Sequence, residues 1–499
     1  MSIWKQARST QMGGPWLTYA DPAEAGWSAE KLQEAKQVFD EIGSAALLIV
    51  DRGAVAAAWG NVTVPYRCHS LRKSLLSALY GIHTKLSNID INRTLSELRI
   101  DDAPPLTEQE RQAKVVHLLK ARSGIYHEAA SETAAMKNNR PARGSHAPDT
   151  FWYYNNWDFN ALESIFERAV DSTVFEEFEQ RLAIPLHMED FSPALHTQMV
   201  KQGQFSIHGA RHYRLSARDL ARFGLLYLQG GRFGDQQLIP DDWIRESTSP
   251  HSIMEPLGAG YGYLWWIPLD AKWRELGMYE ARGVGGQCVT ILPKEDLVIV
   301  HRADTDSGRH VNGRQVLRLY QLILEAKAGA PAIQAPPELI PLEMDTGEMQ
   351  FMLHHYRSFH LKARALEMIE EKHWLEPLSA SNSSSPKDLL VRIVHRDAIA
   401  LDILQSQIPP AETAAEWEQA SRLSSADVSR LWLRRYMEQR ERLYSILQRL
   451  STQDWERTYL WNGREISVKT YFLTNVLLDY QLSEPLLRFF QAHKDAEAH

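Results

Sequence analysis

Residues 66–80 read Tyr-Arg-Cys-His-Ser-Leu-Arg-Lys-Ser-Leu-Leu-Ser-Ala-Leu-Tyr, a polar start followed by a mostly apolar run. The apolar run predicts a helix that is buried on most of its faces. Ser70 lies at the start of this helix and Lys73 follows three residues later, so both side chains project from one face. A hydroxyl beside an amine is the arrangement of a Ser-Lys nucleophile.

The Ser-x-x-Lys spacing is not specific by itself. It also occurs at Ser28 and Lys31 and at Ser384 and Lys387. A serine that caps a helix and a lysine that faces solvent explain the spacing equally well. The rest of the chain must therefore decide between the two interpretations.

The composition is that of an ordinary globular protein. The chain has 499 residues, of which 44% are hydrophobic and 24% charged, with a net charge of -8. This length predicts two or three domains. The mild negative charge argues against nucleic-acid binding, and no basic run indicates a membrane surface. There are 19 histidines but no HExxH or CxxC pattern, so we expect neither a metal nor a cofactor.

The sequence predicts a cytoplasmic protein. It contains two cysteines, Cys68 and Cys288, which indicates reduced thiols rather than a disulfide framework. The first residues lack the apolar core of a signal peptide, and no run of 18 apolar residues occurs.

The first 328 residues predict an α+β domain in two lobes. A helix at 28–42 precedes two strands at 45–50 and 54–59, joined by the turn signal Asp51-Arg-Gly53. A mainly helical region then has helices at 70–85, 111–120, 160–168, 174–182 and 217–228. Strands are expected at 262–267, 279–282, 287–292 and 297–300, the last two as a hairpin, before a helix at 315–327.

A Pro-rich linker at 329–345 separates this domain from a different kind of segment. Four helices are expected at 360–374, 386–405, 426–450 and 467–490. We interpret residues 346–499 as an all-α four-helix bundle.

Two further segments could complete a Ser-Lys site. Tyr154 and Asn156 form a Tyr-x-Asn pattern, although Tyr153 and Asn155 match it as well. A phenol beside an ammonium group has a lowered pKa and can exchange a proton with a serine. The glycine-rich strand start at 282–287 would let a substrate carbonyl approach backbone amides, as in an oxyanion hole.

The order of these segments resembles the superfamily of serine β-lactamases, penicillin-binding proteins and class C-like esterases. The likeness covers residues 20–328 and includes Leu-Leu-Lys-Ala-Arg-Ser-Gly at 118–124, the Tyr154 segment to Leu162, and the helix at 216–224. It implies a β-lactamase-like fold, an antiparallel sheet with flanking helices plus an all-helical lobe.

The resemblance also implies a role for each matching residue. Ser70 attacks a carbonyl and becomes acylated, while Lys73 and Tyr154 relay its proton and later activate water. Asn156 orients Lys73 or the substrate. The amides of Ser70 and Gly286 form the oxyanion hole, with Gly285 and Gln287 beside them.

One departure from the family pattern concerns its third motif, Lys-Thr-Gly or His-x-Gly, in whose place we read Gly283-Val-Gly285. The cation that binds a β-lactam or peptide carboxylate in many members is missing there, and Arg282, as a neighbour on the strand, should face the other way. The altered third motif, together with the segment Ser-Gly-Ile-Tyr-His-Glu at 123–128, resembles the esterase and 6-aminohexanoate-dimer hydrolase branch of the superfamily.

The last 154 residues resemble the DinB-like four-helix fold, whose members bind a divalent metal through three histidines. Residues 471–480, on the last predicted helix, contain no histidine, so we expect no metal and a role in packing, dimerisation or covering the cleft.

The sequence therefore predicts a serine hydrolase for a small ester or amide substrate, without nucleic-acid or membrane partners and with a possible homo-oligomer formed through the bundle. A β-lactamase or peptidase proper and a non-catalytic binding or scaffold protein remain as alternatives. Trp152, Trp157 and Tyr261 are candidate walls of the substrate cleft.

Overall fold

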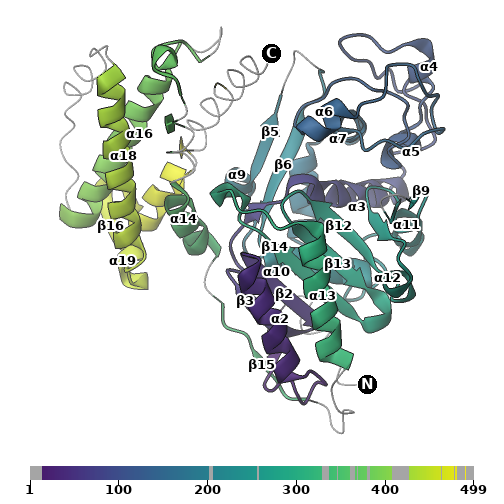
Figure 1. Cartoon of the computed structure of the whole chain (residues 1–499), viewed down its shortest axis with the longest axis horizontal. Coiled ribbons are helices and arrows are strands. Elements are labelled where there is room, and N and C mark those ends of the chain that lie inside the picture. The colour runs from purple at the N-terminus through teal and green to yellow at the C-terminus, as the bar shows by residue number, and fades with distance from the viewer. Residues whose placement is uncertain are drawn as a thin grey trace. The chain divides into compact units, whose positions relative to one another are not determined.

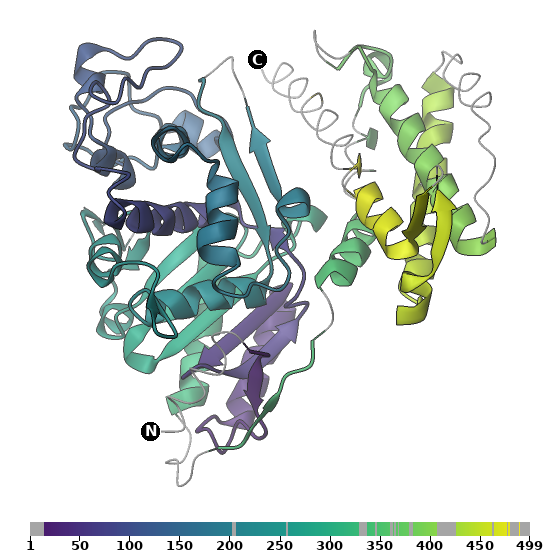
Figure 2. The ribbon, with the colours of Figure 1, turned by 180° about the vertical axis from the view of Figure 1, so that it is seen from behind.

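The computed structural model describes residues 14–201, 206–255, 258–328, 337–344, 347–359, 363, 366–367, 369–378, 383–406, 426–461, 464–476, 478–479 and 489. The chain forms two compact units, one of Met1–Thr305 with Arg309–Asp345, the other of Asp306–Gly308 with Thr346–His499. Figures 1 and 2 show the chain from opposite sides. In the described part of the chain, no helix is both long and apolar enough to cross a membrane.

The first unit is built around a ten-stranded sheet in the order β15-β1-β3-β2-β14-β13-β12-β11-β10-β9. The predicted hairpins form, between β2 and β3 and between β13 and β14. The sheet is mixed rather than antiparallel throughout, because β1 runs parallel to β3. Its strands are β1 Leu17–Tyr19, β2 Ala46–Asp51, β3 Ala54–Gly60, β9 Ser252–Met254, β10 Ala259–Tyr261, β11 Trp266–Pro268, β12 Tyr279–Gly283, β13 Gln287–Leu292, β14 Leu297–Arg302 and β15 Leu339–Pro341.

Helices cover both faces of this sheet. Strand β2 is apolar along most of its length and sends alternate side chains into two separate cores, as a strand buried on both faces must. Helices α2 (Ala29–Glu41) and α13 (Gly313–Ala328) cover the face of Leu47 and Ile49. Helices α3 (Arg72–Lys85) and α10 (Ala217–Leu228) cover the face of Leu48. Figure 1 shows α2 and α13 side by side in front of the sheet.

The lobe that follows α3 is mainly helical, as predicted, but it also contains a small sheet in the order β4-β6-β5. The sequence did not reveal β5 or β6, because β6 buries Arg211 and Arg214 and so lacks the usual apolar alternation. The elements of this lobe and its surroundings are β4 Tyr66–Arg67, α4 Glu108–Arg111, α5 Val115–Leu119, α6 Ala134–Asn138, α7 Asn156–Val170, α8 Val174–Phe178, α9 Pro193–His196, β5 Thr197–Val200, β6 Ala210–Leu215, β7 Arg232–Phe233, β8 Gln236–Gln237, α11 Asp241–Ser247 and α12 Ala271–Glu275.

Part of the predicted linker belongs to the sheet. Residues 329–336 lie outside the described residues, but β15 pairs with β1 in antiparallel register. Leu342 and Met344 pack on the core of the first unit. Their burial ties the chain to that unit before the second begins.

The second unit is mainly helical and also carries a short hairpin. Its elements are α14 Gly347–Arg357, α16 Pro386–Ser406, α18 Ala426–Leu447, α19 Thr452–Glu456, β16 Thr458–Trp461 and β17 Arg464–Ser467. The predicted helices 386–405 and 426–450 form, whereas much of 360–374 and 467–490 lies outside the described residues.

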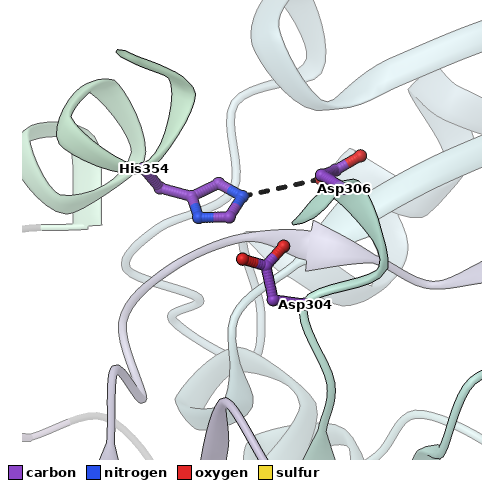
Figure 3. Close-up of side chains that lie close together, drawn as sticks. All are labelled: Asp304, Asp306 and His354. Carbon is purple, nitrogen blue, oxygen red and sulfur yellow. Dashed lines mark ion pairs between the residues drawn. The ribbon is translucent and has the colours of Figure 1, made fainter. Parts of the chain in front are cut away.

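Buried ion pairs link the helices of the second unit. Arg440 on α18 lies 2.6 Å from the carboxylates of both Asp397 and Asp479, and His355 on α14 lies 2.8 Å from Asp479. Figure 3 shows a further pair, in which His354 lies 3.6 Å from Asp306, a residue of the short stretch that groups with this unit. Removing one partner of a buried pair would destabilise the unit, because it would leave a buried charge uncompensated.

Candidate active site

The turn that carries Ser70 is a single 3₁₀ turn, His69–Leu71, immediately before α3. His69 has a φ of 48°, in the left-handed region that is strained for a residue with a side chain. Its Nε2 lies 2.8 Å from Thr305 Oγ1, while Leu71 and Leu75 are buried in the core. These contacts hold Ser70 at the start of α3, where the sequence placed it.

Lys73 lies at the centre of the site. Its Nζ is 3.0 Å from Ser70 Oγ, 2.8 Å from Tyr154 OH and 2.9 Å from Asn156 Oδ1. The side chain is 2% exposed, and Nζ lies 4.2 Å from the centroid of the Phe159 ring. The structure therefore brings together the Ser, Lys, Tyr and Asn that the sequence singled out.

The start of α7 distinguishes the two overlapping Tyr-x-Asn patterns. Asn155 caps the helix, since its side chain accepts a hydrogen bond from Trp157 N. Tyr154 stands just before this cap, and its hydroxyl lies 2.8 Å from Lys73 Nζ. Tyr153 points elsewhere, and its hydroxyl donates to Met136 O at 2.6 Å.

Asn156 uses both ends of its amide within the protein. Its Oδ1 contacts Lys73, and its Nδ2 donates to Ser131 O at 2.7 Å. Of the two roles predicted for this residue, the contacts correspond to orienting Lys73.

Burial sets the proton affinities in the site. Desolvation lowers the pKa of Lys73 well below its usual value, and the charge of Arg72 lowers it further, while Glu163 acts in the opposite direction. Burial raises the pKa of Tyr154 to about 12, although a hydrogen bond with Ser70 and the charge of Arg72 oppose the rise. The prediction of a lowered phenol pKa is wrong, because desolvation outweighs the nearby positive charge.

Gly283 is the glycine that lies against the nucleophile turn. A Cβ there would be 2.3 Å from the Cys68 carbonyl oxygen and 3.2 Å from Leu71 N. Only glycine allows β12 to approach the turn this closely. In the sequence, this glycine is the first residue of the third-motif segment, Gly283-Val-Gly285.

The other predicted glycines lie in the turn between β12 and β13. A Cβ at Gly285 would meet Thr305 and His310. The carbonyl of Gly286 lies 2.6 Å from His301 Nδ1, and Gln287, fully buried, donates to Ala303 O at 2.8 Å. The side chain of Gln287 is thus held within the fold.

Arg282 points away from the face of Gly283, as the alternation of a strand requires. It forms an ion pair with Glu280, which also accepts a hydrogen bond from Thr290. Cys288, the strand partner of Arg282, belongs to the core beneath α2 and α13. The Arg282 guanidinium is thus paired with Glu280, and it also lies 6.0 Å from the centroid of the Trp266 ring.

Aromatic rings surround Tyr154. The Trp266 ring centroid lies 5.4 Å from that of Tyr154, and Trp152 contacts both Tyr261 and Trp266 edge to face. Trp157 was predicted as a wall, but it is fully buried and donates to Asp102 at 2.6 Å. Trp266 takes its place beside the phenol.

An alcohol, an amine, a phenol and an amide are poor ligands for a divalent metal but well suited to moving a proton. The family profile described as Beta-lactamase matches residues 32–320. The chain belongs to the beta-lactamase family. This match contains Ser70, Lys73, Tyr154 and the glycine-rich turn.

Solved structures similar to part of the chain were also found. A protein described as a 6-aminohexanoate-dimer hydrolase from Bacillus anthracis is 16% identical, with a TM-score of 0.47 over 65% of this chain and 91% of its own. A protein described as a beta-lactamase from Bacteroides dorei is 15% identical, with a TM-score of 0.47 over 60% and 99%. A penicillin-binding protein from Bacillus halodurans is 14% identical, with a TM-score of 0.43 over 57% and 98%. A search of curated protein sequences found no match.

Proposed function

We propose that this beta-lactamase family member is a serine hydrolase that cleaves an ester or amide through an acyl-enzyme on Ser70. The observation that carries the proposal is the position of Lys73 Nζ, in hydrogen-bond contact with both Ser70 Oγ and Tyr154 OH inside a buried site. A base in contact with a nucleophile and with a second proton carrier is the requirement for acyl transfer.

In the first half of the reaction, the neutral form of Lys73, which burial favours by lowering its pKa, accepts the proton of Ser70. The Ser70 oxygen then bonds to the substrate carbonyl carbon. Tyr154, which remains a phenol, donates its proton to the leaving oxygen or nitrogen and recovers one from Lys73. The bond to the leaving group breaks, and the acyl-enzyme remains.

In the second half, water attacks the acyl-enzyme while the Lys73–Tyr154 pair accepts its proton. The acid product leaves, and Ser70 regains its hydrogen. The backbone amide of Ser70 and an amide of the turn that follows Gly283 would stabilise the oxyanion in each half. The close approach of β12 to Cys68 and Leu71 supports this placement.

The ion pair between Arg282 and Glu280 favours an ester or simple amide, rather than a β-lactam, as the substrate. The Arg282 guanidinium is paired on the face opposite Gly283, so a substrate carboxylate would have to compete with that ion pair. We expect the protein to hydrolyse p-nitrophenyl esters and to react covalently with a fluorophosphonate. Nitrocefin hydrolysis at a comparable rate would instead identify a β-lactamase, and absence of turnover and labelling would favour a binding protein.

Tyr154→Phe should lower kcat/KM for a p-nitrophenyl ester about 10²- to 10⁴-fold, because the phenol proton no longer reaches the leaving group. Tyr153→Phe is the matched control, since its hydroxyl bonds to Met136 O rather than to Lys73. Steady-state kinetics of the two variants decide the assignment. Equal losses in both would remove Tyr154 from the proton relay.

A further inference from the structure

Helix α7 carries a polar stripe along the side that faces the active site. Its residues recur at intervals of four, three and four, which places them on one helical face. They are Asn156, Asn160, Glu163 and Glu167. Asn156 holds Lys73, and the next two members contact the residue before it in the sequence.

That residue is Arg72, which forms an ion pair with Glu163 and lies 3.4 Å from Asn160 Oδ1. The side chains of Arg72 and Glu163 are 3% and 2% exposed. The second carboxylate oxygen of Glu163 accepts a hydrogen bond from the backbone of Arg211 on β6 at 3.0 Å. Glu163 is thus held by two elements and aimed at α3.

Two neighbouring basic side chains are therefore buried at the start of α3. Two unpaired like charges would be very costly there. Arginine keeps its proton in proteins, whereas a buried lysine can release one. Among the described residues, Glu163 pairs with Arg72, while the hydrogen-bond partners of Lys73 are a serine, a tyrosine and an asparagine.

We propose that Glu163 is a positioning residue of the active site, which holds the Arg72 guanidinium and so determines that Lys73 is the basic group left to exchange a proton. This inference rests on the proposed function, because it assumes that Lys73 is the base. Glu163 touches neither Ser70 nor a substrate, and it acts through charge and through Arg72.

The charges around Lys73 come from several elements. The titratable groups that face this region are Arg72 and Tyr80 from α3, Glu163 and Glu167 from α7, Arg211, His212 and Tyr213 from β6, and Tyr154. Of these, Arg72 and Glu163 act directly on Lys73 with opposite signs. Removing Arg72 alone and removing Glu163 alone should therefore move the Lys73 titration midpoint in opposite directions.

The titration can be followed in the full-length protein through the Cε signal of [13C]lysine, with the Lys73 signal identified by its loss in Lys73→Met. Glu163→Gln leaves Arg72 uncompensated and should lower the midpoint by about one pH unit. Arg72→Gln leaves Glu163 unopposed and should raise it by about one pH unit. The double variant should fall between the two.

Glu167→Gln is the matched control. Glu167 lies one turn further along the same stripe and pairs with Arg211, which also lies 4.0 Å from Glu163, so its loss breaks a neighbouring ion pair without removing a partner of Arg72. It should leave the Lys73 midpoint unchanged. Glu163→Asp keeps the charge and should return the midpoint toward that of the wild type.

An unchanged or raised midpoint in Glu163→Gln would overturn the inference. If that variant does not fold, Arg72→Gln and the double variant decide, because removing both charges of a buried pair is tolerated better than removing one. In that case, a Lys73 midpoint that is not raised in Arg72→Gln would refute the inference. The titration needs no substrate, so failure of the proposed function would show separately, as a wild type without Ser70-dependent turnover.

Discussion

Ser70→Ala should abolish covalent labelling by a fluorophosphonate and lower ester turnover at least about a thousandfold. The reason is that, among the described residues, the hydrogen-bond partners of Lys73 Nζ are Ser70, Tyr154 and Asn156, and of these three only Ser70 carries an alcohol. Intact-protein mass spectrometry checks the labelling, and steady-state kinetics with a p-nitrophenyl ester check the turnover.

Ser28→Ala provides the matched control, because Ser28 and Lys31 have the same spacing as Ser70 and Lys73. Ser28 caps α2, and its side chain accepts a hydrogen bond from Lys31 N. Its loss should cost about 1 kcal/mol of stability and no activity. Undiminished labelling of Ser70→Ala would remove Ser70 as the nucleophile.

Lys73→Met should lower kcat/KM about 10²- to 10⁴-fold, because the substitution removes the base and preserves the length of a buried side chain. In the wild type, activity should rise with pH through the lowered pKa of Lys73, since the neutral amine is the active form. This rise of activity with pH, the acid limb of the profile, should be absent from the residual activity of Lys73→Met. A pH profile of kcat/KM for both proteins makes the comparison.

Lys31→Met is the control for this substitution. Lys31 lies on the surface, where it pairs with Glu34 at 2.8 Å, and its replacement should change neither the rate nor the pH profile. A Lys73→Met protein with the wild-type acid limb would show that another group titrates there.

The sheet and its covering helices follow from local patterns in the sequence. The apolar runs of β2 and β14, the turn at Asp51-Arg-Gly53 and the stripe of α10 each predict their element from adjacent residues. Strands β5 and β6 were missed because their pairing depends on partners far along the chain and on buried arginines.

The candidate active site was likewise predicted in part from the sequence. Ser70 lies in the 3₁₀ turn that leads into α3 and Lys73 in the first turn of α3, so their three-residue spacing predicts that the two side chains lie on one side. The sequence also placed Tyr154 and Asn156 in the set by their order, but it left the register of Tyr153 and Tyr154 open. The hydrogen bonds resolve that register, because Tyr154 contacts Lys73 whereas Tyr153 donates to Met136 O.

By itself, the sequence determined the α+β architecture and singled out Ser70 and Lys73 as candidates, through local patterns and through the order of the motifs along the chain. Tertiary structure alone decided the proton affinities and the role of each glycine. A pKa depends on burial by elements distant in sequence, as the raised value of Tyr154 shows. The close approach of Gly283 to Cys68 likewise exists only once β12 packs against the turn before α3.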